Sequence, residues 1–227
     1  MNMKKGFTLA EVLITLSIIG VVSALTLPNL SSGYSRQVTA TQLSKAINTL
    51  ENANAITLLN TPALSGNEYY TAISNSIKAT RRNLANNPIA GHYKTFNGGP
   101  NGITTTPTTD VVFDTKDGMT FIQINTGTAA AGNNDLPDMY SGRYYTIFVD
   151  INGSAKAPNA VGKDLFQLNI DTLGIVIPNG GTAWAQYNDD ANTAWDTSGT
   201  ACKKNEIDFA LNCAGAIVDN GYSVNYF

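Results

Sequence analysis

Lys4-Lys5-Gly6-Phe7-Thr8-Leu9-Ala10-Glu11 begins a long apolar run that continues to Leu27 in this chain of 227 residues. Between Phe7 and Leu27 the only ionisable side chain is that of Glu11. A helix over these residues, rising about 1.5 Å per residue, is about long enough to cross the ~30 Å hydrocarbon core of a bilayer. Because Lys4 and Lys5 precede the run, the positive-inside rule leaves the N-terminus in the cytoplasm and directs the rest of the chain outward.

Glu11 is the residue of this run that most needs an explanation. A secretory signal peptide also has a basic region, an apolar region and a small-residue cleavage site, here at Val22-Ser23-Ala24. A carboxylate at mid-membrane, however, costs about 2.5–3.5 kcal/mol on insertion scales, and an acidic residue inside a span usually has a functional partner. Glu11 therefore argues against a plain signal peptide, which stays as an alternative together with a simple signal anchor.

The segment resembles the leader and N-terminus of type IV prepilins and type II secretion pseudopilins. The resemblance implies that a prepilin peptidase cuts after Gly6 and that the new N-terminal residue, Phe7, is N-methylated. It also implies that Glu11 pairs with the α-amine of Phe7 in a neighbouring subunit. Pairing two desolvated charges between subunits would set the axial register of a growing helical array.

Gly20 and Pro28 lie where similar pilins have a glycine and a proline, between which the helix bends or melts when the subunit leaves the bilayer. Proline removes a helical hydrogen bond and glycine lowers helix propensity; the alternative is a helix that ends at Pro28. Helical spacing resumes beyond Pro28, however, and stops at the turn signal Asn60-Thr61-Pro62. The apolar stripe consists of Tyr34, Val38, Leu43, Ile47, Leu50 and Leu58. We therefore expect one long, bent helix from Phe7 to Asn60.

The rest of the chain predicts a sheet. Gly66 to Leu84 is weakly helical, with Arg81-Arg82 at the end of the helix, and Asn86 to Thr109 has the composition of a surface loop. Strand signals follow, with turn dipeptides at Asp117-Gly118 and Asn152-Gly153. The predicted strands are 111–113, 119–124, 144–151, 165–170 and 175–177, the last two linked through 171–174. A long helix followed by an antiparallel meander is an α+β order, which is also the type IV pilin-like fold that the resemblance implies.

Cys202 and Cys213 are the only cysteines. An even pair in an exported chain favours a disulfide, with two separate buried thiols as the alternative. Between them, Asn205 could cap a helix that carries Glu206 and Asp208 in its first turn and ends at Gly221. Pilins similar to this chain have a disulfide near the C-terminus that holds the final segment.

The oxygen-bearing side chains of Asp150, Asn152 and Asp164 are hard ligands of the kind that calcium prefers. Several major pseudopilins bind calcium in a loop of the head, so calcium is an alternative here. The spacing fails the EF-hand pattern because Gly153 comes too early, and Asn and Asp at a hairpin are ordinarily turn formers. We expect turn chemistry at these residues and no bound cofactor.

The sequence lacks the parts of an enzyme. His92 is the sole histidine, and no phosphate loop, nucleophile elbow or His-carboxylate cluster is present. The net charge is −3, and outside the leader the only adjacent basic residues are the two pairs Arg81-Arg82 and Lys203-Lys204. No basic patch is evident, so nucleic acid is not an expected partner. Trp184 and Trp195 could form a packing lid over the sheet or an exposed adhesive loop.

These patterns divide the chain into a leader peptide (1–6), a transmembrane or filament-core segment (7–30) and an exported head (31–227) that includes the second half of the helix (31–60). The resemblance implies a pilin or pseudopilin of a type IV pilus or type II secretion pseudopilus. Its partners would be other pilins, the prepilin peptidase, the inner membrane and its assembly platform. The alternative is a minor pilin whose head binds a surface, DNA or an exported substrate.

Overall fold

The computed structural model describes residues 6–60, 66–84, 92–94, 110–123, 145–170, 175–182, 202 and 210–226. The elements in chain order are α1 (Leu9–Asn60), α2 (Gly66–Ser76), β1 (Thr80–Leu84), β2 (Asp110–Asp114), β3 (Thr120–Gln123), β4 (Tyr145–Asp150), β5 (Leu165–Ile170), β6 (Val176–Pro178), the 3-10 helix η2 (Ala210–Asn212) and α4 (Cys213–Asp219). The strands form one antiparallel sheet in the order β1 to β6. The predicted α+β, pilin-like fold is confirmed.

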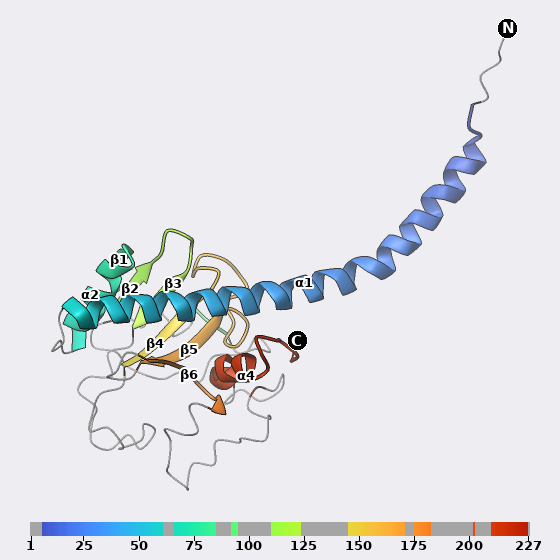
Figure 1. Ribbon diagram of the computed structural model, residues 1–227. Helices are drawn as coiled ribbons and strands as arrows, with labels where there is room; N and C mark the ends of the chain where they lie inside the picture. The colour runs from blue at the N-terminus through green and yellow to red at the C-terminus, as the bar shows by residue number, and fades with distance from the viewer. Residues whose placement is uncertain are drawn as a thin grey trace.

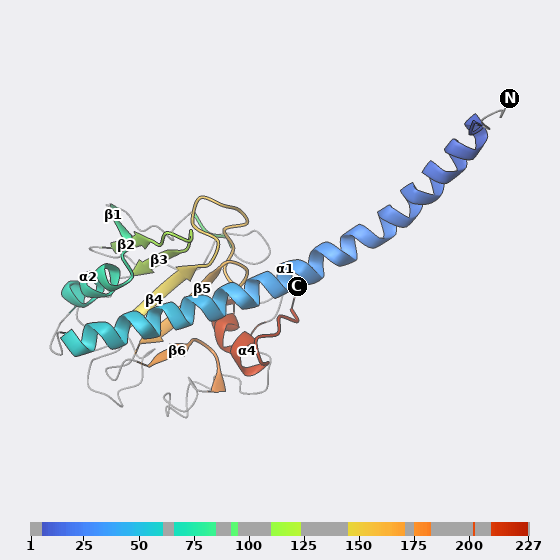
Figure 2. The same cartoon turned by 45° about the horizontal axis from the view of Figure 1, so that its top comes forward.

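Helix α1 has two halves with different surroundings. Figures 1 and 2 show that its N-terminal half stands clear of the head, that its C-terminal half lies across the sheet, and that its axis bends between the two. Pro28 lies inside α1, and proline is one of the few causes of a helix bend because it removes an i to i−4 hydrogen bond. The single long helix is confirmed, and the alternative of a helix that ends at Pro28 is wrong.

The C-terminal half of α1 forms the main core with one face of the sheet. Leu43 and Leu50 of α1 are fully buried, and Phe113 and Phe121 stack across the β2–β3 pair at a centroid distance of 5.1 Å. Tyr34, expected in the buried stripe, is 72% exposed. That expectation is wrong because Tyr34 precedes the part of α1 that packs on the sheet: among the described residues of α1, the first buried one is Thr39.

The opposite face of the sheet also buries apolar side chains. Val112, Ile122 and Phe148 alternate with the residues of the main core and pack with Tyr93 and Val161 in a second cluster. Tyr93 is 1% exposed although it belongs to the stretch that composition assigned to a surface loop. The prediction of a surface loop at 86–109 is therefore wrong at Tyr93, which packs against the second face of the sheet.

One further expectation needs correction. Arg81-Arg82 do not end a helix: α2 ends at Ser76, Lys78 has a φ of 56°, and the arginines lie in β1, which pairs with β2. The predicted turn at Asn152-Gly153 lies at the start of the connection between β4 and β5, which spans residues 151–164 because Asp150 pairs with Leu165. The predicted link at 171–174, the two tryptophans and the predicted cap Asn205 lie outside the described residues.

The expected stop of the C-terminal helix at Gly221 is confirmed. Gly221 has a φ of 62°, its N–H donates to the Val218 carbonyl, and the Tyr222 N–H donates to the Ile217 carbonyl. These two bonds form a Schellman motif, in which a left-handed residue closes the last turn.

Gly215 provides a test of how closely α4 approaches the sheet. A Cβ at Gly215 would collide with the backbone of Gly180 and Gly181, which follow β6. We expect Gly215→Ala to lower the free energy of unfolding of the head by about 1–3 kcal/mol, as measured by urea unfolding of the full chain in detergent micelles.

The matched control is Gly33→Ala in α1, where a Cβ meets nothing within 4 Å. Because alanine is the better helix former by about 1 kcal/mol, this variant should be neutral or slightly more stable. Equal destabilisation by the two substitutions would contradict the close contact between α4 and the turn after β6.

Candidate functional site

Thr8 and Glu11 form a reciprocal cap at the start of α1. The Thr8 backbone N–H and hydroxyl both donate to Glu11 Oε2, at 2.8 and 2.9 Å, and the Glu11 N–H donates to Thr8 Oγ at 3.3 Å. This capping box satisfies N–H groups that the first helical turn leaves without partners. It also places a carboxylate at the positive end of the helix dipole. The Glu11 side chain is therefore held beside the N-terminal end of α1, next to Phe7.

The helix that follows this cap has an uncovered apolar surface. Leu9–Thr26 is the one segment of the described residues that is long and apolar enough to cross a membrane. None of it is buried within the chain, and Leu25, for example, is 70% exposed. An apolar surface of this extent in a protein marks a contact with lipid or with another chain.

Three hydroxyl groups of this segment bind the backbone of the helix itself. Thr15, Ser17 and Thr26 donate to backbone carbonyls three or four residues earlier, at 2.8–2.9 Å. Since a hydroxyl without a hydrogen bond is costly in hydrocarbon, these internal bonds make the segment more compatible with an apolar environment than its composition indicates.

The predicted site residues at the N-terminus lie along this one helix. Phe7 precedes α1 and is 89% exposed, and Gly20 lies in the uncovered half with open space around it. Glu11 is the only one of them for which the described residues show a specific side-chain contact. The roles of Gly6 and Phe7 in processing, and of Gly20 and Pro28 in bending, stay predictions.

Residues 1–27 match the family described as the prokaryotic N-terminal methylation motif. This motif is the prepilin-type signal of type IV pilins and pseudopilins. The match supports a type IV pilin-like or pseudopilin-like precursor processed by prepilin peptidase, and the motif belongs to structural subunits that are not known as enzymes. No curated protein and no solved structure matches the chain. The match ends at Leu27, before the head begins.

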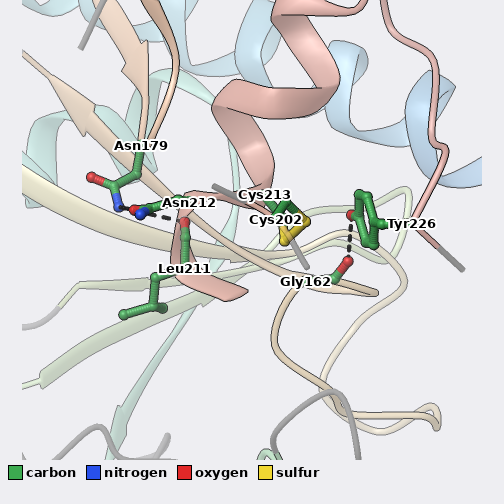
Figure 3. The surroundings of a disulfide bond; sticks show 7 residues. All are labelled: Gly162, Asn179, Cys202, Leu211, Asn212, Cys213 and Tyr226. Carbon is green, nitrogen blue, oxygen red and sulfur yellow. Dashed lines mark hydrogen bonds between the residues drawn. A yellow bond between two sulfur atoms is a disulfide. The ribbon is translucent and has the colours of Figure 1, made fainter. Parts of the chain in front are cut away.

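The predicted disulfide joins Cys202 to Cys213, the first residue of α4 (Figure 3). The two Cα atoms are 4.8 Å apart, and the cysteines are 9% and 1% exposed. The alternative of two separate buried thiols is therefore wrong. The bond ties a residue far along the chain from the sheet strands to the start of the C-terminal helix.

Asp150 and Asp164 are buried side chains that organise the connection between β4 and β5. Asp150 Oδ2 accepts a 2.6 Å hydrogen bond from the Tyr93 hydroxyl, and its Oδ1 accepts from the N–H groups of Asn152 and Gly153 at 3.1 and 2.8 Å. Asp164 accepts from the N–H groups that begin the turn before it, at 2.7 and 2.6 Å. Three of the four carboxylate oxygens therefore bind N–H groups of the loop itself, as turn-forming aspartates do, and the fourth binds Tyr93.

These contacts bear on the calcium alternative. The Asn152 amide does not join the two carboxylates: its Nδ2 donates to the Ala157 carbonyl at 3.3 Å. Among the described residues no group of three or more His, Cys, Asp or Glu side chains is arranged to hold a metal ion. A cation at Asp150 and Asp164 would compete with the backbone donors that the carboxylates already bind, so the geometry fits turn chemistry better.

Burial makes the two carboxyl groups weaker acids than usual. It raises the pKa of Asp150 to about 6, and repulsion from Asp164 adds to this effect while the Tyr93 hydroxyl opposes it. Burial also raises the pKa of Asp164. Because the folded state binds a proton at a pH where the unfolded chain has lost it, the contribution of Asp150 to stability is present below the unfolded pKa of 3.8 and is lost as the pH rises through about 6.

We therefore expect the head to lose stability between pH 4 and pH 7. Asp150→Asn keeps an oxygen acceptor for the loop but removes the titration, so it should flatten this dependence by up to about 3 kcal/mol. The measurement is urea unfolding of the full chain in detergent micelles across this range, with a chelator present. Glu51→Gln, at an exposed glutamate of α1, is the control and should leave the profile unchanged.

A rise in stability from pH 4 to pH 7 in the wild-type chain would contradict this sign. A gain in stability on adding calcium at neutral pH, absent in Asp150→Asn, would identify the loop as a cation site and overturn its interpretation as turn chemistry.

Proposed function

We propose that the chain is a structural subunit of a filament, a pilin or pseudopilin of a type IV pilus or a type II secretion pseudopilus. One observation carries the proposal: the methylation motif places a capped carboxylate at the start of a helix whose apolar half has no cover within its own chain. Such a helix needs lipid before assembly and neighbouring helices afterwards.

Before assembly, the segment 7–30 spans the inner membrane and the head, residues 31–227, lies outside the cytoplasm. Prepilin peptidase hydrolyses the bond between Gly6 and Phe7 and removes residues 1–6, including Lys4 and Lys5. The cut creates a free α-amine at Phe7, which is then N-methylated. Processing therefore removes the cations that hold the N-terminus in the cytoplasm and supplies a new positive charge next to Glu11.

The geometry of the cap explains how Glu11 serves two partners. Both Thr8 donors reach the same oxygen, Oε2, and no described hydrogen bond involves Oε1. An ammonium group from the Phe7 of a neighbouring subunit can bind Oε1 while the cap stays closed. In an apolar filament core this charge pair is favourable only with good geometry and additional hydrogen bonds, and the cap supplies those hydrogen bonds.

The N-terminus of the native protein provides the first test of this proposal. Mass spectrometry of protein isolated from cells with its own peptidase should find N-methylated Phe7 as the first residue. An N-terminus at Leu25 would identify an ordinary signal peptide and overturn the proposal.

The charge pair provides a second test. We expect Glu11→Val to abolish filaments in sheared preparations while the protein stays in the membrane fraction, because the valine segment inserts without a charge to pair. Thr8→Ala should reduce the yield less, since it loosens the cap but keeps the carboxylate. Thr15→Val is the control, because the Thr15 hydroxyl contacts only its own helix. Normal filament yield from Glu11→Val would refute the charge pair.

The abundance of the chain in sheared filaments separates two roles within this proposal. A major subunit dominates such preparations, whereas a minor pilin that binds a surface, DNA or an exported substrate is nearly absent from them.

A further inference from the structure

Helix α4 is held to the sheet by a polar contact that does not involve the cysteines. Asn179, the residue after β6, donates from Nδ2 to Asn212 Oδ1 at 2.7 Å and to the Leu211 carbonyl at 3.4 Å (Figure 3). Its own carbonyl accepts a 2.8 Å hydrogen bond from the Gly215 N–H. Asn179 thus binds η2 and the first turn of α4 through both its side chain and its backbone.

The same asparagine is bound on its other side by the sheet. Asn169 of β5 donates from Nδ2 to Asn179 Oδ1 at 3.2 Å, and Thr146 of β4 donates to Asn169 Oδ1 at 3.1 Å. Asn169, Asn179 and Asn212 are each at most 4% exposed. Removing one partner of a buried amide costs the full desolvation free energy of the polar group that is left without a hydrogen bond. A network in which every group is satisfied therefore favours one arrangement of its residues. The network therefore specifies where η2 and α4 dock.

Two other contacts hold the end of α4 and the chain beyond it. Asp219, the last residue of α4, accepts hydrogen bonds from the Thr182 N–H and hydroxyl at 2.7 and 2.9 Å. The Tyr226 hydroxyl donates to the Gly162 carbonyl at 2.5 Å (Figure 3). Together with the buried side chains of Ala214 and Ile217, these contacts hold α4 and the last described residue of the chain to the head.

The disulfide has a different geometric role. It joins Cys213 to Cys202, and neither cysteine belongs to a strand of the sheet. Cys213 directly follows Asn212, which Asn179 binds, and both cysteines also pack in the main core. The bond fixes residue 202 to a helix that other contacts already place.

We propose that Asn179 docks α4 on the sheet without the disulfide, so that the head folds with both thiols free and the Cys202–Cys213 bond closes afterwards on the folded head. In the closing step the two thiols lose two electrons and two protons to a disulfide oxidant, which is reduced to two thiols by way of a mixed disulfide. The proposal concerns the head alone and holds whether or not the chain polymerises.

Hydrogen exchange of the full chain in detergent micelles tests the docking, with α4 compared with β5 in the same molecule. In the double variant Cys202→Ala/Cys213→Ala, the ratio of the exchange rates of α4 and β5 amides should be the same as in the wild type. A fall in global stability would raise both rates but would leave this ratio unchanged. In Asn179→Ala with intact cysteines, α4 should exchange at least about tenfold faster relative to β5, equivalent to 1.4 kcal/mol of local docking.

Asn48→Ala, at an exposed asparagine of α1, is the matched control and should change neither rate. If Asn179→Ala does not fold, Asn212→Ala replaces it in this experiment, because it removes the acceptor of the Asn179 side chain. Selective loss of α4 protection in the cysteine variant, with retention in the asparagine variants, would overturn the proposal.

Closure of the bond on an already folded head is tested by refolding the reduced wild-type chain and then adding oxidised glutathione, with free thiols trapped by alkylation. Because any bond that stabilises the folded state is itself stabilised by folding, the folded chain should form the bond with an effective thiol concentration at least about tenfold above that of the chain in urea. Equal effective concentrations would show that closure owes nothing to folding and would contradict the proposal.

Discussion

The burial of the C-terminal half of α1 against the sheet is the interaction on which the rest of the structure depends. Leu43 and Leu50 are fully buried in the cluster that contains Phe113, Phe121 and Phe166. Each such side chain contributes about 1.5–3 kcal/mol when it leaves water. The N-terminal half of the same continuous helix is apolar and uncovered. A single helix, α1, therefore both forms the core of the head and extends out of it.

Polar groups in apolar surroundings find hydrogen-bond partners in three ways along this chain. Glu11 accepts two hydrogen bonds from Thr8 at the helix N-terminus. Asp150 and Asp164 bind the N–H groups of their own loop, and the buried asparagines bind one another. In each case the polar group has specific donors or acceptors, as the cost of an unsatisfied polar group in apolar surroundings requires. Only the first case sits on an element that has no cover of its own, and this is why the proposed function centres on Glu11.

Periodicity made most of the fold predictable. The spacing from Val38 to Leu50 indicated a helix packed on one side, and alternation with turn dipeptides located β2 to β6 to within a few residues. β1 was missed because Thr80-Arg81-Arg82-Asn83-Leu84 has neither alternation nor β-branched residues beyond its first position, and it is a strand because β2 offers it an edge. Tyr93 was missed because one aromatic residue in a polar stretch has no period to reveal it.

The sequence by itself determined the processing signal, the apolar span with its single carboxylate and the order of helix and strands. These depend on local composition and on spacing along the chain, which any one segment carries within it. The tertiary structure decided that the sheet is covered on both faces, that Cys213 meets Cys202, and that Asn169, Asn179 and Asn212 dock the final helix. No pattern distinguishes those three asparagines from the many others in the chain, because their role comes from residues that meet only when the strands and the helix are packed.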